Sequence, residues 1–199
     1  SAGAGLAGAI RNEYFITEEK LHETGLMKYF IGVTAKYWET VLTNGNMMEH
    51  LDNKFEHGPH GFNYAAKITS AWTVHQFENE YNPIHDHANC KISAVMHLKY
   101  PENIDPPVKE HLKGLDGHLI FTGMGGADAW CTAPVLNINA AEVGVLHIFP
   151  ASLGHSVYPF KGKGERRSLS FNADIISQKQ MEVIAEQQRI EEENKKGEL

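Results

Sequence analysis

The sequence Asn-Pro-Ile-His-Asp-His-Ala-Asn-Cys, at residues 82–90, is the most informative segment for the fold and the function of the chain. His85 and His87 lie two positions apart, so in an extended backbone both side chains leave the same face. Pro83 is a turn residue that leads into the pair, and a largely apolar run from Ile92 to Leu98 follows it. The pattern predicts an extended segment that presents two imidazoles side by side, next to a buried strand.

Far downstream, the region of residues 149–172 supplies a third histidine and a candidate carboxylate-binding pair. His155 ends the sequence Phe-Pro-Ala-Ser-Leu-Gly-His at residues 149–155, and Arg166 begins Arg-Arg-Ser-Leu-Ser-Phe-Asn at residues 166–172. Two histidines on one strand plus one distant histidine can form a facial three-ligand set that leaves coordination positions open. Strand alternation places Arg166 and Ser168 on one face, where a guanidinium and a hydroxyl can grip a carboxylate. The two segments together predict a metal site next to a carboxylate clamp, suited to a small dicarboxylate.

Some assignments remain open from spacing alone. Asp86 is a substitute for His87 as a ligand, although in an extended chain it points to the opposite face from His85. Either Arg166 or Arg167 is expected to pair with Glu165, and the Arg-x-Ser spacing selects Arg166 for the clamp. His97 and His147 interrupt apolar strands and are interpreted as wall or surface residues rather than ligands. The candidate pocket residues are Trp72, Asn82 and Lys91.

The order of predicted elements indicates a mainly β fold. An amphipathic helix is expected over residues 18–43 with a break at Gly25, and a shorter one over residues 48–55. From residue 64 the pattern changes to short strands at 67–77, 91–100, 118–122, 135–138 and 144–149, and a hairpin of 156–160 with 167–173. Such a series of short strands after one long helix predicts a β-sandwich or jelly roll, with the helix covering one sheet from outside.

Size and composition fit a single domain of 199 residues. We expect a flexible arm over residues 1–16, helical support over 17–60, the β core over 64–175 and a charged C-terminal helix over 177–199. A net charge of −7 argues against nucleic acid as a partner, and no apolar run approaches the length of a membrane helix. The two cysteines, Cys90 and Cys131, do not form a disulfide framework, so a cytoplasmic location is expected. An oligomer is compatible with the sequence.

The motifs in their order resemble the iron(II)/2-oxoglutarate-dependent oxygenases. The resemblance is closest to a group of such oxygenases from marine phages and bacteria, which carry Trp, then Asn-Pro-x-His-x-His, then Phe-Pro-x-x-x-x-His, and finally Arg-x-Ser-x-Ser-Phe-Asn. The chain shows these at Trp72, 82–87, 149–155 and 166–172. The resemblance implies a double-stranded β-helix of the cupin-like type. It also implies iron(II) on His85, His87 and His155, with 2-oxoglutarate on Arg166 and Ser168.

The same resemblance implies a dioxygenase, usually a hydroxylase, acting on an unidentified primary substrate in the cytoplasm of a bacterium or of a phage's host. His87 departs from the wider family, most of which has a carboxylate at this position. Two other functions therefore stay open. One is a cupin-type metal enzyme that uses three histidines without 2-oxoglutarate. The other is a non-enzymatic jelly roll, either a binding module or a virion-associated protein, which would bind no metal.

Overall fold

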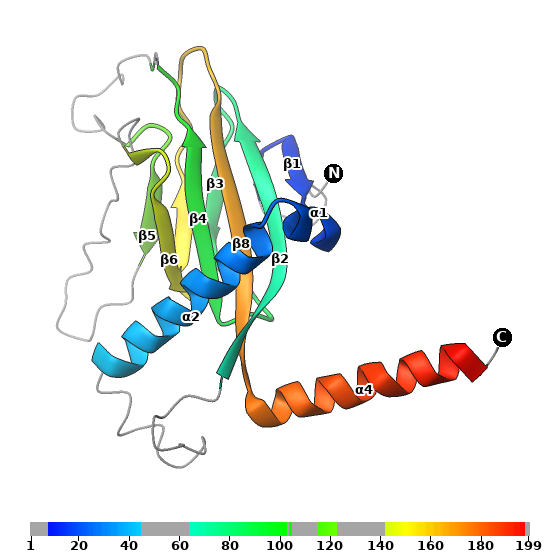
Figure 1. The fold of residues 1–199 in the computed structure, drawn as a ribbon. Helices are drawn as coiled ribbons and strands as arrows, with labels where there is room; N and C mark the ends of the chain where they lie inside the picture. The colour runs from blue at the N-terminus through cyan, green and yellow to red at the C-terminus, as the bar shows by residue number, and fades with distance from the viewer. Residues whose placement is uncertain (1–7, 45–63, 103, 105–114, 123–141, 198–199) are drawn as a thin grey trace.

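The computed structural model describes residues 8–44, 64–102, 104, 115–122 and 142–197. Its strands form a five-stranded sheet with the order β1-β2-β8-β4-β6, and a three-stranded sheet with the order β3-β7-β5. Every strand pairing in the two sheets is antiparallel. The two sheets face one another as a jelly roll, and the helices lie outside the larger sheet (Figure 1). The predicted mainly β class is confirmed.

Except for β1, the strands overlap segments that the sequence predicts as extended, although several ends differ by three or four residues. The larger sheet contains β1 (Asn12–Phe15), β2 (Tyr64–Gln76), β8 (Arg166–Ser177), β4 (Ile92–Lys99) and β6 (Leu146–Pro150). The smaller sheet contains β3 (Asn82–His85), β7 (Gly154–Val157) and β5 (Leu119–Thr122). The helices are α1 (Glu18–Glu23), α2 (Leu26–Asn44) and α4 (Gln178–Gly197).

Local sequence explains how the helical support begins. The Thr17 side chain accepts a hydrogen bond from the Lys20 backbone N–H, which caps α1, and two glutamates occupy the first turn. Gly25 has φ +76°, in the left-handed region that glycine adopts without strain, and it separates α1 from α2 as predicted. Figure 1 shows α2 crossing the outer face of the five-stranded sheet.

Two apolar cores lie on opposite faces of that sheet. On the outer face, Phe30 of α2 stacks on Phe171 of β8 with ring centroids 4.2 Å apart. Between the two sheets, Val95, Phe121 and Phe149 belong to a second buried cluster. Strand alternation in β8 thus sends Phe171 toward the helices and its neighbours Ser170 and Asn172 toward the space between the sheets. This space holds the candidate site.

Two predictions differ from the structure. The expected hairpin of 156–160 with 167–173 is wrong, because β7 and β8 belong to different sheets and the segment between them crosses from one sheet to the other. The second half of the expected flexible arm over 1–16 is instead ordered, since residues 12–15 form β1 and Ile10 is buried. The Ile16 backbone N–H also donates to the Ala71 carbonyl, which continues the attachment to β2.

Some predicted elements cannot be compared with the structure. The short helix over 48–55, the strand over 135–138 and residues 1–7 of the arm lie outside the described residues. The predicted C-terminal helix is present as α4, which projects away from the sheets in Figure 1. Among the described helices, none is long and apolar enough to cross a membrane.

Candidate metal centre

Three histidines converge in a cavity that is lined by residues of both sheets. His85 in β3 lies directly opposite His155 in the antiparallel partner β7, and His87 follows two residues after His85. One ring nitrogen from each of the three lies within 4.8 Å of the others, and the Nε2 atoms of His87 and His155 are 3.3 Å apart. Two nitrogens bound to one metal ion at roughly 2 Å lie about 3 Å apart, so this spacing suits a shared ion.

Backbone carbonyls fix two of the rings in the tautomer that a metal requires. His85 Nδ1 lies 2.8 Å from the Pro83 carbonyl oxygen, and His155 Nδ1 lies 2.9 Å from that of Leu153. A carbonyl oxygen only accepts, so each Nδ1 must carry the proton and donate it. Each Nε2 therefore carries the lone pair with which the ring can bind a metal.

His87 is held by a side chain instead. Its Nδ1 lies 3.4 Å from the Asn172 amide nitrogen, and the Asn172 amide oxygen accepts a hydrogen bond of 2.8 Å from the Ser93 hydroxyl. With the amide in this orientation, Nδ1 of His87 accepts and the proton lies on Nε2. Turning the amide over would offer its oxygen to an Nδ1–H group and free Nε2, while Ser93 would then accept from the amide nitrogen.

Burial keeps His87 and His155 neutral at pH 7. Desolvation is the main cause that lowers the pKa of His87 to about 4, with smaller contributions from the nearby His155 and His85. Desolvation also lowers the pKa of His155 to about 4, against a hydrogen bond to the Leu153 carbonyl that raises it. Neutral imidazole is the form that binds metal. Asp86 is exposed and does not belong to the convergent group, so its side chain stands apart from the three nitrogens.

Arg166 lies in the same cavity as the three histidines. It is 1% exposed, and its Nη1 and Nη2 donate to Gln76 Oε1 at 3.3 Å and to His97 Nε2 at 2.5 Å. Its Nε–H has no hydrogen-bond partner, and within the described ranges no carboxylate lies within ion-pair distance of it. Burial lowers the pKa of Arg166 to about 10, which still leaves a full positive charge at pH 7.

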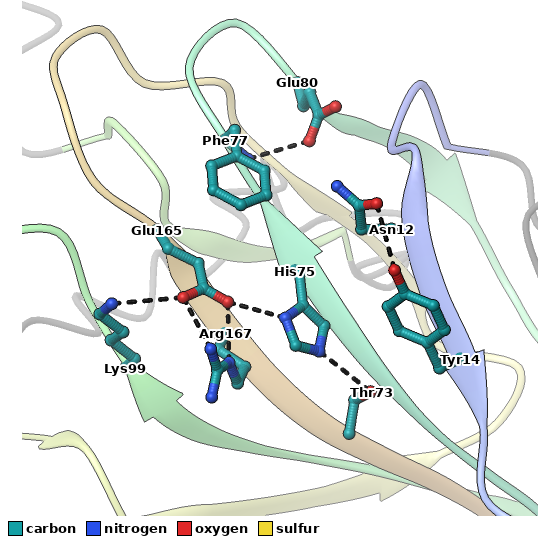
Figure 2. Close-up of polar contacts among 9 residues, drawn as sticks. All are labelled: Asn12, Tyr14, Thr73, His75, Phe77, Glu80, Lys99, Glu165 and Arg167. Atoms are coloured by element: carbon teal, nitrogen blue, oxygen red, sulfur yellow. Dashed lines mark hydrogen bonds and ion pairs between the residues drawn. The ribbon is translucent and has the colours of Figure 1, made fainter.

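The acid that could have neutralised Arg166 lies on the other face of the sheet. Glu165 accepts from Arg167 Nε at 2.7 Å and from Arg167 Nη2 at 2.8 Å, and it also contacts Lys99 and His75 (Figure 2). The Arg167 hydrogen bonds, followed by those of Lys99 and His75, lower the pKa of Glu165 to about 2 against the opposing effect of burial. Glu165 thus pairs with Arg167, and Arg166 is a buried cation with no carboxylate partner in the described part of the chain.

The remaining predicted pocket residues divide into two groups. Ser168, Trp72 and Asn82 line the cavity together with the histidines and Arg166. Lys91 does not line it, and this prediction needs correction: its ammonium group forms an ion pair with Asp174 and donates to the Ile175 carbonyl. Lys91 lies one residue before β4, and its ion pair holds the ammonium group at Asp174, near the end of β8.

Sequence reasoning missed several polar residues that contact the side chains lining the cavity. Gln76 and His97 contact Arg166 from β2 and β4, and Asn172 contacts His87 from β8. Gln76 and His97 lie 90 and 69 positions from Arg166 in the chain, so only strand register brings them together. Strand alternation could have indicated the Asn172 contact, because it places Asn172 on the same predicted inward face as Arg166 and Ser168.

Known proteins give an independent comparison. The sequence model of a family described as "Putative 2OG-Fe(II) oxygenase" matches residues 70–172, just over half of the 199-residue chain. The matched range contains the three histidines, Arg166 and Ser168. No curated protein matches the chain.

Solved structures show more distant similarity. A 2OG-Fe(II) oxygenase family oxidoreductase from Burkholderia pseudomallei is 16% identical with a TM-score of 0.42, and the alignment covers 55% of this chain and 44% of that one. A prolyl-4-hydroxylase from Pseudomonas putida is 14% identical with a TM-score of 0.46, covering 84% of this chain and 76% of that one. A cupin from Desulfovibrio desulfuricans is 12% identical with a TM-score of 0.28, covering 60% and 95%.

This chain therefore spans less than half of the Burkholderia protein, and all three TM-scores are below 0.5. The assignment rests on the family match, which includes both motif segments, and that family uses iron(II) and 2-oxoglutarate. With its match over residues 70–172, the chain belongs to the 2OG-Fe(II) oxygenase family.

Proposed function

We propose that the protein is an iron(II)- and 2-oxoglutarate-dependent dioxygenase that hydroxylates a primary substrate. His85, His87 and His155 would hold the metal, and Arg166 with Ser168 would bind the far carboxylate of 2-oxoglutarate. When bound, iron(II) supplies the oxygen-activating chemistry of the family. The chain's own residues would bind and orient the co-substrate, and burial keeps His87 and His155 neutral.

The observation that carries the proposal is the buried charge of Arg166, which has no carboxylate partner among the residues that the structure describes. A buried guanidinium without a carboxylate is costly, because neither water nor an opposite charge compensates its desolvation. Its two hydrogen-bonded neighbours, Gln76 and His97, are neutral acceptors. A carboxylate arriving from solution would supply the missing charge, and Arg166 binds such groups through two parallel hydrogen bonds.

The position of this cation next to the histidines narrows the ligand further. The cavity that Arg166 lines with Ser168 is also lined by His85, His87 and His155. A ligand that bridges them needs a metal-chelating group at one end and a carboxylate at the other. 2-Oxoglutarate has both, with its 2-oxo acid at one end and its second carboxylate at the other.

The two other functions predict different behaviour. A cupin-type enzyme would bind metal through the histidines but would leave the charge of Arg166 without a partner, unless its own substrate were an acid. A non-enzymatic jelly roll would have no use for two Nε2 lone pairs held free by backbone carbonyls. The combination of free ring nitrogens and an unpaired cation favours the oxygenase.

An anaerobic titration tests the proposal. Iron(II) is added to the full chain, then 2-oxoglutarate, while the visible absorbance is followed for the metal-to-ligand charge-transfer band of the chelate. We expect the band to appear and saturate. Metal binding without the band would favour the cupin-type function, and a lack of metal binding would favour the non-enzymatic one.

A matched pair of arginine variants tests the clamp. Arg166→Gln should weaken 2-oxoglutarate binding by at least about 30-fold, because it removes charge-assisted hydrogen bonds to a buried carboxylate. Arg167→Gln changes the adjacent residue on the opposite face and should leave 2-oxoglutarate affinity unchanged. Metal affinity should be the same in both variants. Equal 2-oxoglutarate affinity in the two variants would remove Arg166 from its proposed role.

A further inference from the structure

We propose that His97 is a positioning residue for the co-substrate: with Gln76 it holds the Arg166 guanidinium in place without neutralising its charge. This inference rests on the proposed use of 2-oxoglutarate. It assigns a role to a histidine that touches neither the metal ligands nor, in the proposed arrangement, the co-substrate itself. His97 would act only through Arg166.

Strand register brings the three side chains together. Arg166 begins β8 and lies opposite Gln76 in β2. On the other side of β8, His97 in β4 lies opposite Ser168, two residues along from Arg166 and on the same inward face. The guanidinium is therefore held from both neighbouring strands, through Nη1 on one side and Nη2 on the other.

Both acceptors are themselves fixed. The Gln76 amide nitrogen donates to the carbonyls of Glu80 at 2.6 Å and Tyr158 at 3.0 Å, so its oxygen must turn toward Arg166. His97 is 0% exposed and sits inside the sheet sandwich, where its ring cannot reorient without displacing its neighbours. An arginine that has four freely rotating side-chain bonds is thereby reduced to one position.

The choice of histidine has a chemical reason. Burial, followed by the nearby charge of Arg166, lowers the pKa of His97 to about 2, so the ring is neutral at pH 7 and accepts through Nε2. A carboxylate at the same place would form an ion pair with Arg166 and compete with the incoming ligand. Arg167 illustrates that outcome on the opposite face, where Glu165 engages its guanidinium through two hydrogen bonds.

The hydrogen bond to Arg166 has a cost that a purely structural histidine would avoid. Because Nε2 accepts, the ring proton lies on Nδ1, which is buried and has no partner among the described residues. A buried N–H without an acceptor is destabilising. The same ring that carries this unfavourable donor also offers its Nε2 as an acceptor to Arg166. This combination supports a role for His97 beyond packing.

The test compares two co-substrates that differ only in the carboxylate that Arg166 would bind. 2-Oxobutanoate has the chelating 2-oxo acid of 2-oxoglutarate and lacks the second carboxylate. Anaerobic titrations of the iron(II)-loaded full chain give the affinity for each. The variants are His97→Leu, which removes the acceptor, His97→Gln, which keeps one, and His147→Leu, a nearby histidine that makes no hydrogen bond to Arg166.

We expect His97→Leu to weaken 2-oxoglutarate binding by about 10-fold or more, the range for a hydrogen bond to a charged group, while 2-oxobutanoate binds as before. His97→Gln should recover most of the loss, and His147→Leu should match the unsubstituted protein. Equal weakening of both ligands in His97→Leu, or of neither, would overturn the inference. An unsubstituted protein that does not bind 2-oxoglutarate would instead overturn the proposed function.

A second variant covers the case in which His97→Leu does not fold. Gln76→Glu keeps the size of the side chain and places a carboxylate against Arg166 from the other strand. If Arg166 must be held by neutral acceptors, this variant should lose 2-oxoglutarate affinity by about 10-fold or more and keep its affinity for 2-oxobutanoate. Unchanged 2-oxoglutarate affinity in Gln76→Glu would also overturn the inference.

Discussion

Two groups of histidines lie between the same two sheets, and they differ in what their ring nitrogens can do. In the first group, His85, His87 and His155 bring one ring nitrogen each within 4.8 Å of the others. In the second group, His97, His118 and His147, each ring keeps one buried nitrogen without a hydrogen-bond partner. Within the described ranges, only the first group forms a cluster that could hold a metal.

The difference shows that backbone placement, rather than the number of histidines, makes a metal site. His85 and His155 each donate Nδ1–H to the carbonyl two residues earlier, which leaves Nε2 free. In the second group, the Nε2 of His97 is already used by Arg166. Burial lowers the pKa of His118 and His147, so these rings also stay neutral, yet their nitrogens do not converge. The first group is proposed to bind a cation, whereas His97 of the second group contacts the cation Arg166.

The largest predicted effect separates the two groups directly. His155→Ala should weaken iron(II) binding by more than about 100-fold, beyond the 10–100-fold loss typical of outer residues, because it removes one of three proposed ligands. His147→Ala should bind iron(II) as the unsubstituted protein does. An anaerobic iron(II) titration, monitored by calorimetry, gives the affinities of both variants. Similar losses in the two variants would mean that the first group is not the metal site.

A smaller effect is expected at the residue that holds His87. Asn172→Leu should weaken metal binding by about 10-fold, since His87 alone among the three lacks a carbonyl partner for Nδ1. Asn172→Asp should bind metal at least as tightly as the unsubstituted protein, because a carboxylate accepts from Nδ1–H and strengthens the ring as a ligand. The affinities come from titration with cobalt(II), whose visible spectrum also reports the ligand geometry. Equal affinities in the Leu and Asp variants would show that the amide does not orient His87.

Sequence patterns predicted which side chains would lie close together where these share a strand or a short segment. The two-residue spacing of His85 and His87 and the Arg-x-Ser spacing both translate directly into a shared face. The Trp72 and Asn82 predictions also match the lining of the cavity. The contacts of Gln76 and His97 with Arg166 were not predicted, because Arg166 lies on another strand. The register between strands that are distant in the sequence cannot be derived from local alternation.

The same limit explains the failed hairpin. Gly162 and Gly164 both have positive φ, as turn glycines do, so the local signal for a turn was correct. A tight turn between two strand patterns usually joins neighbours in one sheet. Here the chain passes from β7 in the small sheet to β8 in the large one, a choice set by how the two sheets close over the apolar core between them.

The outer face at the start of β8 gives a prediction about acid stability. Glu165 has a folded pKa of about 2, below its ordinary value of 4.5, so its interactions stabilise the fold above pH 4.5 and are lost as the pH falls toward 2. Glu165→Gln should therefore lower the unfolding free energy by about 1–2 kcal/mol at pH 7, where hydrogen bonds to a charged group are lost. Near pH 2 the two proteins should converge. Urea denaturation at several pH values measures this, and a difference that does not depend on pH would exclude the charge of Glu165 as its origin.

The smallest effect is expected at Lys91, whose ion pair with Asp174 lies on the surface, with 51% of the lysine side chain exposed. Lys91→Met should lower the unfolding free energy by less than about 1 kcal/mol, because water and salt screen such pairs. Since Lys91 does not line the cavity, iron(II) and 2-oxoglutarate affinities should not change. Urea denaturation and the anaerobic titration test the two halves of this expectation separately. A loss of 2-oxoglutarate affinity in Lys91→Met would mean that Lys91 contributes to the site after all. The co-substrate would then interact with Lys91 as well as with Arg166.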